Sequence, residues 1–488
     1  MPQFESFQNL SLGTIAPLLA SIGLVWVIVY RCFFHPLAAI PGPFWAKLSK
    51  LWLLQHDFSW KGSESLHKLH QKYGPIVRIA PNEVSYDDLA AYSDLYGQKS
   101  RFLKEEAWYY GIIPASLISM FTTCDAELHS ILRRLFSHAF SRTSVIGFQD
   151  KINEHINIAL ESVSALSAEG QPVRTYDMAA SFTLDTISRL CFGNSVKALS
   201  RPTFDHPLID SLDGLLFEPL VLMRIHYPAF CYIPRRGNFS HQAELLRVIS
   251  GCLDELEVHD KDVGEFSLIQ DASRRAKELG FDLDKQKKTS ILFQFVGAGF
   301  GTTAMTIAGI LQHLMRNPEM YKRLQAELTA LSPNKIEMMT VYQIENLPYF
   351  EACIKEGIRV VCASPLRMPK VAPEEGYKFG GYHVPAGTTV SSSNYFRCYD
   401  EKFYPEPFRF IPERWMTEES KALNASWLPF AKGNRSCIGQ HMSMVETKLF
   451  VAHFVRRFEP VVLVDDFITK ERLVLQPANP MRVLLREV

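Results

Sequence analysis

An uninterrupted hydrophobic run lies near the start of the chain. No Asp, Glu, Lys or Arg occurs between Ser6 and Tyr30. Residues 12–30 (LGTIAPLLASIGLVWVIVY) would form about 28 Å of helix at about 1.5 Å per residue, which is enough to cross a bilayer core. Glu5 precedes the run and Arg31 follows it, whereas a cleaved signal peptide has a basic leading segment and small residues at the cut. The pattern therefore predicts an uncleaved membrane anchor.

The residues after this run predict its orientation and a change of structure. Arg31, Lys47 and Lys50 place positive charge on the C-terminal side, which predicts that this side is cytosolic. Residues 35–43 (HPLAAIPGP) contain three prolines and a glycine, so they form a stiff, non-helical link. We therefore divide the chain into an anchor at residues 1–31, a Pro/Gly hinge at residues 32–43 and one globular domain at residues 44–488.

The remaining pattern is mostly that of helices. Apolar residues recur with helical spacing at residues 126–140, 289–316, 347–361 and 438–458. Strands are predicted from β-branched and turn residues at residues 75–86, 367–389, 472–475 and 481–485. Residues 403–415 (FYPEPFRFIPERW) are too rich in proline for a helix or a central strand, so an irregular segment is expected. The predicted fold class is mainly α with a smaller β part.

Composition narrows the class of protein. The chain has 488 residues, of which 47% are hydrophobic, and this is ample for a large buried core. Lys plus Arg equals Asp plus Glu at 52 each, so no overall field would recruit nucleic acid. The nine cysteines are scattered without a CxxC pair, which argues against a disulfide framework and for a reducing compartment.

The predicted helix at residues 289–316 is apolar nearly all round, which indicates a buried position. Gly297, Gly299 and Gly301 interrupt its centre and Thr302 follows. Each glycine costs about 1 kcal/mol relative to alanine, so about 3 kcal/mol must be offset. Three interpretations are open: tight helix packing through Gly297 and Gly301, a structural threonine bonded back to a carbonyl, or a groove where something large lies against the backbone.

Three other features have both a plain and a functional interpretation. Glu356 and Arg359 stand three apart on a helix and would form an exposed ion pair. His129 and Arg133 stand four apart on an amphipathic helix, where they would be structural or would hold a carboxylate. Cys437 lies between glycines in FAKGNRSCIGQHM, where it would be a metal ligand, a nucleophile or a buried small residue.

Taken together, these segments resemble the cytochrome P450 superfamily of haem-thiolate monooxygenases. The pattern FxxGxRxCxG, which is specific in this context, is formed by Phe430, Gly433, Arg435, Cys437 and Gly439. ExxR stands at residues 356–359, PERW at 412–415 and AGxxTT at 298–303, and the resemblance covers nearly the whole chain. The stretches HPLAAIPGP, KYGPIVRIAPNEVSY and HSILRRLFSHAFS resemble membrane-bound ascomycete enzymes of secondary metabolism.

The resemblance implies a cytochrome P450 fold, preceded by one transmembrane helix, around haem b (heme). Cys437 would be the axial thiolate ligand of the iron, Gly433 and Gly439 would let the loop lie under the porphyrin, and Phe430 would shield the sulfur. The haem propionates would be bound by Arg435, His129, Arg133 and Lys370, with Arg367 sharing this role. Lys370 stands where relatives commonly have arginine, and it lacks the two-pronged geometry. A buried charged network would be formed by Glu356, Arg359 and Arg414.

The resemblance also implies a catalytic residue and a substrate pocket. Thr302 matches the family threonine that assists proton delivery, but Gly301 replaces the acid that relatives usually carry before it. The pocket would include the helix face and loop residues Phe295, Ala298, Phe300 and Leu366. Further aromatic and apolar candidates are Trp108, Tyr109, Tyr110, Phe217, Leu220 and Phe230. Such a lining suits a bulky, apolar substrate, although aromatic residues at these spacings also occur in plain cores.

The function expected from the resemblance is the insertion of one oxygen atom from dioxygen into a hydrophobic secondary metabolite, a terpenoid or polyketide. The missing acid at Gly301 keeps a second outcome open, namely rearrangement, desaturation or ring formation without net oxygen insertion. A haem sensor or carrier and a membrane adaptor without cofactor are the non-enzymatic alternatives.

Electrons must come from another protein, because the sequence has no flavodoxin-like or Rossmann fingerprint. The resemblance implies NADPH–cytochrome P450 reductase on the same membrane, with cytochrome b5 as a further donor. Lys432 and Arg134 are candidates for a basic docking face, or are ordinary surface charges. The expected location is the endoplasmic reticulum membrane, single-pass, with the catalytic domain in the cytosol and membrane lipid as a further partner.

Overall fold

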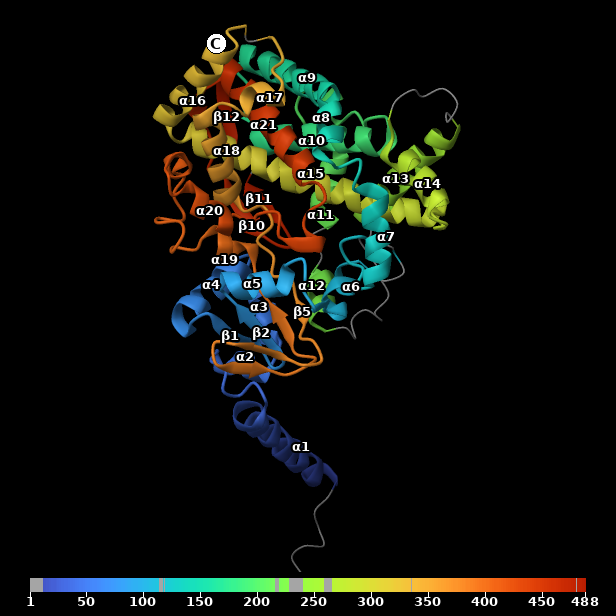
Figure 1. Ribbon diagram of the computed structural model, residues 1–488, viewed down its shortest axis with the longest axis vertical. Coiled ribbons are helices and arrows are strands. Elements are labelled where there is room, and N and C mark those ends of the chain that lie inside the picture. Colours follow the sequence, from blue (N-terminus) through green and yellow to red (C-terminus); the bar gives the residue numbers. More distant parts are fainter. Residues whose placement is uncertain are drawn as a thin grey trace, which may run out of the picture.

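The computed structural model describes residues 12–488 except 114–116, 118, 216–218, 228–239, 259–265, 335 and 480. Helix α1, Leu12–Val29, projects from the globule and continues as a π-helical turn at Tyr30–Phe34 (Figure 1). Among the described residues, two helices are long and apolar enough to cross a membrane. The first is Ala16–Phe34, whose window is not buried at all, and the second is the mostly buried α15 (Lys285–Met315). Only the first is a candidate anchor, as predicted from the sequence.

The main sheet forms the lower part of the globule, next to the link that follows α1 (Figure 1). Its strand order is β1-β2-β8-β5-β3, in which β2 and β8 run parallel and the other neighbouring strands run antiparallel. The strands are β1 Ile76–Ala80, β2 Glu83–Tyr86, β3 Leu103–Lys104, β5 Lys370–Val371 and β8 Thr389–Ser391. This sheet joins chain segments from both predicted strand regions, residues 75–86 and 367–389.

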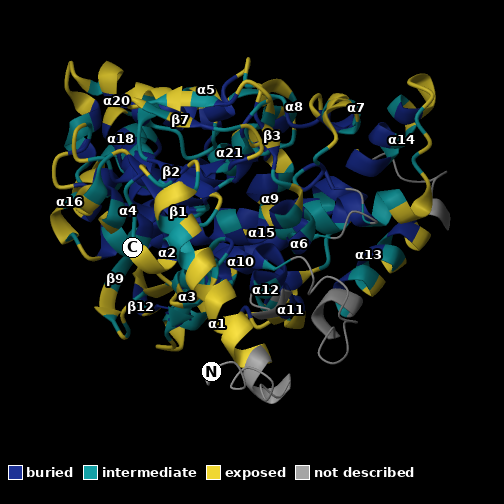
Figure 2. Cartoon of the chain, turned by 90° about the horizontal axis from the view of Figure 1, so that it is seen from below, coloured by how far each residue is buried: buried dark blue, intermediate teal, exposed yellow. Residues whose placement is uncertain are grey.

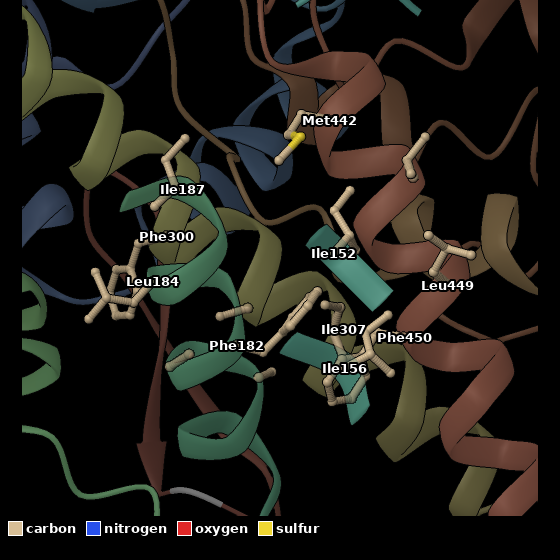
Figure 3. Packing of buried hydrophobic residues seen from close by; sticks show 14 of the residues in the cluster. Ile152, Ile156, Phe182, Leu184, Ile187, Phe300, Ile307, Met442, Leu449 and Phe450 are labelled. Carbon is tan, nitrogen blue, oxygen red and sulfur yellow. The ribbon is translucent and has the colours of Figure 1, made fainter. Parts of the chain in front are cut away.

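The helical part is built around α15, which is buried through the middle of the molecule (Figure 2). It packs against α10 (Thr175–Phe192), α18 (Pro348–Val361) and α21 (Gln440–Arg457). In the core, side chains of α10, α15 and α21 converge (Figure 3), and the ring centroids of Phe182 and Phe450 are 4.8 Å apart. This packing places the middle of α15 beside the start of α21, where the cysteine loop ends.

The remaining elements surround these two parts. The other helices are α2 Phe44–Leu48, α3 Leu51–Phe58, α4 Gly62–Tyr73, α5 Leu89–Tyr96, α6 Glu106–Ile112, α7 Ala126–Phe136, α8 Arg142–Gly147, α9 Gln149–Ala168, α11 Pro207–Leu215, α12 Pro219–His226, α13 Ser240–Val258, α14 Leu268–Glu278, α16 Pro318–Leu331, α17 Val341–Ile344, α19 Asn394–Cys398 and α20 Ser420–Ser426, with 3₁₀ turns at Ala198–Ser200, Pro412–Met416 and Gly433–Arg435. The smaller sheets contain β4 Val173–Arg174, β6 Tyr377–Phe379, β7 Tyr382–Val384, β9 Phe458–Leu463, β10 Ile468–Glu471, β11 Leu475–Asn479 and β12 Arg482–Glu487.

The mainly helical class with small sheets is confirmed, and so are the long helix after Cys437 and the irregular Pro-rich segment. The strand predicted at residues 472–475 is wrong, because residues 472–474 form the turn between β10 and β11. β10 is largely exposed and polar and β11 contains Pro477, so neither showed apolar alternation. The helix predicted at residues 126–140 ends at Phe136, shortly before Ser141 caps the next helix.

Candidate active site

A cavity of about 450 Å³ lies between the two parts of the fold. The middle of α15 forms one wall, and α7, β3, β5 and the loop before α21 contribute the others. Most of its surface is apolar, but several basic side chains gather on the side formed by α7, β3 and β5. The cavity therefore combines a hydrophobic chamber with a strongly cationic edge.

Cys437 lies on the wall of this cavity, in the loop that precedes α21. Its backbone N–H donates to the carbonyl of Phe430 at 2.9 Å, which closes the loop. The exposed surface of the side chain borders the cavity, and burial raises the pKa of the thiol above its usual value. The Gly439 backbone N–H and the positive charge of Arg133 act in the opposite direction, because they stabilise the thiolate.

Gly433 and Gly439 have different structural roles. Gly433 has a φ of 76°, and a Cβ added there would lie 2.3 Å from the carbonyl oxygen of Tyr96. It does not line the cavity, and the close approach of α5 by itself requires glycine here, while the role of Gly433 beneath a porphyrin stays a prediction. Gly439 does line the cavity, and a Cβ there would lie 3.9 Å from the sulfur of Cys437.

The four basic residues proposed for the propionates all line the cavity, namely His129, Arg133, Lys370 and Arg435. Arg133 donates to the backbone oxygen of Ser436 at 2.6 Å, and Arg435 donates to that of Thr123 at 3.1 Å. Within the described ranges, none of the four has a carboxylate as an ion-pair partner. The pKa of His129 is lowered to about 3, first by burial and then by the positive charges of Arg435, Lys104, Arg133 and Lys370. Its imidazole is therefore neutral.

Lys104 is a fifth basic residue at this edge, and sequence reasoning missed it. It pairs across strands with Lys370 in the β3–β5 register, and its ammonium lies over the ring of Tyr109 at 4.3 Å. Burial lowers the pKa of Lys104 well below its usual range and that of Lys370 to about 8. No local motif marks Lys104, because only the pairing of residues 266 positions apart brings it here.

Arg367 lies apart from the basic residues that line the large cavity. It is held by ion pairs to Glu83 and, at 3.3 Å, to Asp57, and it lies outside the lining of the large cavity. The suggestion that it assists Lys370 is therefore wrong, because its charge is already balanced by two carboxylates.

The helix α15 presents its glycines in two directions. A Cβ added at Gly297 or Gly301 would meet nothing within 4 Å, whereas one at Gly299 would lie 2.9 Å from a side-chain carbon of Ile187. Packing through Gly297 and Gly301 is thus wrong, since the packing glycine is Gly299 against α10. Thr302 lines the cavity, and its hydroxyl donates to the carbonyl of Ala298 at 2.9 Å.

Glu356, Arg359 and Arg414 meet in one buried network. Glu356 Oε1 lies 2.8 Å from Arg359 Nη2 and 3.0 Å from Arg414 Nε, and Trp415 Nε1 donates to Oε2 at 2.9 Å. Both Glu356 and Arg359 are 0% exposed, so the exposed ion pair considered from the sequence does not form. Arg359 also donates to the carbonyl of Cys398 at 2.7 Å, which ties α18 to the end of α19.

The four predicted pocket residues all line the cavity: Phe295, Ala298, Phe300 and Leu366. Of the further candidates, Tyr109 lines it too, whereas Trp108 faces a smaller pocket and the Tyr110 hydroxyl accepts from Cys124 N–H at 3.3 Å. Phe217, Phe230 and the side chain of Leu220 lie outside the described residues. Arg134 and Lys432 are both exposed, as a docking face requires.

Two acidic residues on the cavity wall were also missed by sequence reasoning. Glu446 of α21 is 2% exposed, and burial raises its pKa well above the usual range. Asp213 of α11 accepts hydrogen bonds from two buried side chains and has a pKa raised to about 7 by burial. An acid in an amphipathic helix normally indicates a solvated face, so no sequence pattern marks either residue.

Comparisons with known proteins agree with this arrangement. The family description "Cytochrome P450" matches residues 40–485. The cytochrome P450 monooxygenase BipB of Cochliobolus sativus is 30% identical over 453 residues, covering 89% of this chain and 87% of that protein. The cytochrome P450 monooxygenases sdnE of Sordaria araneosa and tpcB of Cochliobolus heterostrophus are each 28% identical, covering 89% and 97% of this chain and 89% and 96% of their own lengths. The chain therefore belongs to the cytochrome P450 family, whose members are haem monooxygenases of the oxidoreductase class.

Proposed function

We propose that the chain binds haem b through Cys437 and inserts one oxygen atom from dioxygen into a hydrophobic secondary metabolite, a terpenoid or polyketide. The supporting observation is the cluster of four cavity-facing lysine and arginine side chains, next to the neutral His129, that lack carboxylate partners in the described part of the chain. Burying uncompensated positive charge is costly, so this edge of the cavity fits a group that carries anionic carboxylates. The haem propionates have this chemistry.

The residues present fit the group. Cys437 would hold the iron, because Gly439 N–H and Arg133 stabilise its thiolate. Arg133, Arg435, Lys104 and Lys370 would hold the propionates, with His129 among them. When bound, haem with a thiolate ligand supplies the activation of dioxygen. Phe430 would keep water from the sulfur, and the Glu356 network would fix the segments behind the loop.

On the opposite wall, Thr302 would hold and pass a proton at its hydroxyl. The hydroxyl donates to Ala298 O, so its own oxygen can accept a hydrogen bond from water in the cavity. Gly301 leaves open space beside it where relatives usually carry an acid, so water would replace that acid as a proton carrier. The apolar lining from Phe295, Ala298, Phe300 and Leu366 would hold the substrate and exclude bulk water.

The electrons would come from NADPH through a separate reductase on the same membrane, with cytochrome b5 as a further donor. The exposed Lys432 and Arg134 support a basic docking face for an acidic partner. The apolar span Ala16–Phe34 supports an anchor in the endoplasmic reticulum membrane with the catalytic domain, residues 44–488, in the cytosol.

The carbon monoxide difference spectrum of the reduced protein, expressed with a reductase, tests the thiolate ligand. We expect the thiolate-type band in the wild type, its loss in Cys437→Ala, and its retention in Cys32→Ala, which removes a cysteine of the π-helical turn outside the cavity. A colourless, well-folded protein, or an imidazole-type spectrum, would contradict the proposal.

Product analysis with labelled dioxygen distinguishes oxygen insertion from its alternative. The absence of an acid at Gly301 favours a test for rearrangement, desaturation or ring formation as the second outcome. Candidate terpenoid and polyketide scaffolds would be fed to the expressing host. Label in the product supports oxygen insertion, whereas an unlabelled product, once carbonyl and water exchange are excluded, supports the alternative. Steady NADPH use coupled to product would exclude a sensor.

A further inference from the structure

An acidic side chain interrupts the apolar part of the cavity wall. Asp213, near the end of α11, lines the same cavity as Cys437 but comes from a different set of elements. The lining of the same cavity also contains the apolar residues Ile187, Leu212, Val221, Phe293 and Leu473. A carboxyl group in an apolar wall is costly unless it has hydrogen-bond partners, so its contacts decide what it can do.

Two buried side chains hold the carboxyl group in place. The hydroxyl of Tyr176 on α10 donates to Asp213 Oδ1 at 2.9 Å. The amide of Gln476 on β11 donates to the same oxygen and to the backbone oxygen of Asp213, both at 3.2 Å. Tyr176 and Gln476 are 1% and 2% exposed. For the second oxygen, Oδ2, the described residues provide no hydrogen bond, and so an oriented acceptor remains free at the cavity.

The charges around Asp213 are also negative. Burial raises its pKa to about 7, the Tyr176 hydrogen bond lowers it, and Asp177 of α10 and Asp210 of α11 raise it further. On the neighbouring helix α13, Glu244 accepts from Ser211 at 2.8 Å, and it is not among the groups that shift the pKa of Asp213. No basic partner of Asp213 is found among the residues described. This corner of the cavity thus has the opposite polarity to the edge formed by Lys104, Lys370 and the arginines.

We propose that Asp213 is a specificity-determining residue that accepts a hydrogen bond from a hydroxyl group on an otherwise apolar substrate, and disfavours substrates with a carboxylate at that position. This inference rests on the proposed function, because it assigns the cavity to a substrate. It narrows the substrate class to hydrophobic alcohols. Tyr176 and Gln476 are positioning residues, because they orient the carboxyl group without facing the substrate.

A hydroxyl group fits this site better than an ammonium group does. Both the ionised and the protonated carboxyl group accept a hydrogen bond from a hydroxyl, so an alcohol can bind on either side of neutral pH. An ammonium needs the ionised form, which burial disfavours, and it would itself lose its hydration in this apolar part of the cavity. A carboxylate would add a further like charge beside Asp177 and Asp210.

Binding of matched probes to the haem-loaded, full-length protein tests the proposal. The probes are labelled 1-dodecanol, dodecyl methyl ether, which lacks the donor, and dodecanoate. Affinities are measured by equilibrium dialysis and, in parallel, by the shift of the haem absorption band. In the wild type we expect the alcohol to bind about tenfold more tightly than the ether. Asp213→Leu should bring this ratio close to one. Dodecanoate should bind weakly to the wild type and more tightly to Asp213→Leu, which lacks the acid.

The pH dependence separates recognition from a purely structural role. An ionised carboxylate accepts a stronger hydrogen bond than the neutral acid, so the alcohol-to-ether ratio should rise from pH 6 to pH 8 in the wild type. Asp213→Asn keeps the shape of the side chain and should show no such rise. Glu374→Gln is the control, because Glu374 is an exposed acid that neither lines the cavity nor shifts the pKa of Asp213, and this variant should keep the wild-type ratio.

Each failure has a distinct meaning. Equal affinities for alcohol and ether in a protein with a normal thiolate spectrum would overturn the role of Asp213 and leave the proposed function intact. A protein that fails to bind haem would overturn the proposed function, while the dialysis ratio, which does not depend on haem, would still report on Asp213. If Asp213→Leu does not fold, a pH-dependent ratio that persists in Asp213→Asn would overturn the proposal by itself.

Discussion

Lys104 and Lys370 stand directly opposite each other on the antiparallel strands β3 and β5. Like charges in such cross-strand positions repel, and here both lysines are also buried. Lys104 donates to the carbonyl of Phe121 and Lys370 to that of Phe102 at 3.4 Å, so neutral oxygens are their hydrogen-bond partners. An anion in the cavity would relieve this repulsion, which is why the pair supports the proposed position of the haem carboxylates.

We expect Lys104→Met to loosen the haem, because it removes one of the cations that would hold a propionate. The rate of haem transfer to excess apomyoglobin should rise about tenfold, which corresponds to one charge-assisted hydrogen bond. Lys402→Met, which changes an exposed lysine, is the control and should leave the rate unchanged. An unchanged rate in Lys104→Met would show that Lys104 does not contact the haem.

Removing one partner of the buried network should be far more damaging than removing a surface partner. Arg359→Ala leaves the carboxylate of Glu356 buried without its main cation, and we expect a loss of about 3–5 kcal/mol of stability. Urea denaturation followed by circular dichroism measures it. The control is Arg409→Ala, because Arg409 and Glu406 form a pair whose side chains are both more than half exposed, and its cost should stay below about 1 kcal/mol. Similar losses in the two variants would contradict the network.

Alanine substitutions at two glycines should have opposite effects. At Gly433 the positive φ and the Tyr96 carbonyl, 2.3 Å from an added Cβ, make Ala costly by about 2–3 kcal/mol or more. At Gly301 the added Cβ meets nothing within 4 Å, so Ala should stabilise the helix by up to about 1 kcal/mol. Thermal unfolding measures both changes, and a stable Gly433→Ala variant would be incompatible with the observed contact.

The open space at Gly301 also allows an acid to be introduced. Gly301→Asp should fold, and its carboxyl group would stand next to Thr302 as an additional proton carrier. We expect more product and less hydrogen peroxide per NADPH consumed, with Gly301→Asn as the uncharged control of similar size. If the coupling of NADPH to product is the same in all three proteins, the missing acid is unimportant for this reaction.

Glu471 should make stability depend on pH. Its carboxylate accepts from Ser63 N–H at 3.0 Å and from the Ser63 hydroxyl at 2.6 Å, but burial raises its pKa to about 7. A carboxyl group with a raised pKa binds protons more tightly in the folded state, so its ionisation costs stability as pH rises from about 4 to about 7.

Glu471→Gln removes this ionisation. Relative to the wild type, the variant should gain roughly 1–3 kcal/mol between pH 4 and pH 8, measured as the difference in unfolding free energy at the two values. Glu374→Gln, at an exposed glutamate, should show no such gain and serves as the control. A gain of the same size at both pH values would mean that the effect comes from packing and not from titration.

The sequence by itself determined the features that depend on neighbouring residues. Helical spacing predicted the buried helix α15 and the long helix after Cys437, because the period of apolar residues is a local property. The short motif around Cys437, together with the motifs that contain Glu356 and Thr302, predicted the family. The comparisons then established it. The strand predicted at residues 472–475 was wrong, because exposed residues in β10 and Pro477 in β11 left no apolar alternation, whereas the strand predicted at residues 481–485 corresponds to β12.

Only the tertiary structure decided which distant residues share a site. It placed Lys104 opposite Lys370, moved Arg367 away from the cavity to Glu83, and gave Asp213 its hydrogen bond from Tyr176. These relationships join residues that are tens to hundreds of positions apart, so a local sequence pattern cannot predict them. The physical reason is that burial and charge balance are properties of the folded chain, so the same lysine or aspartate is ordinary on a surface and decisive on a cavity wall.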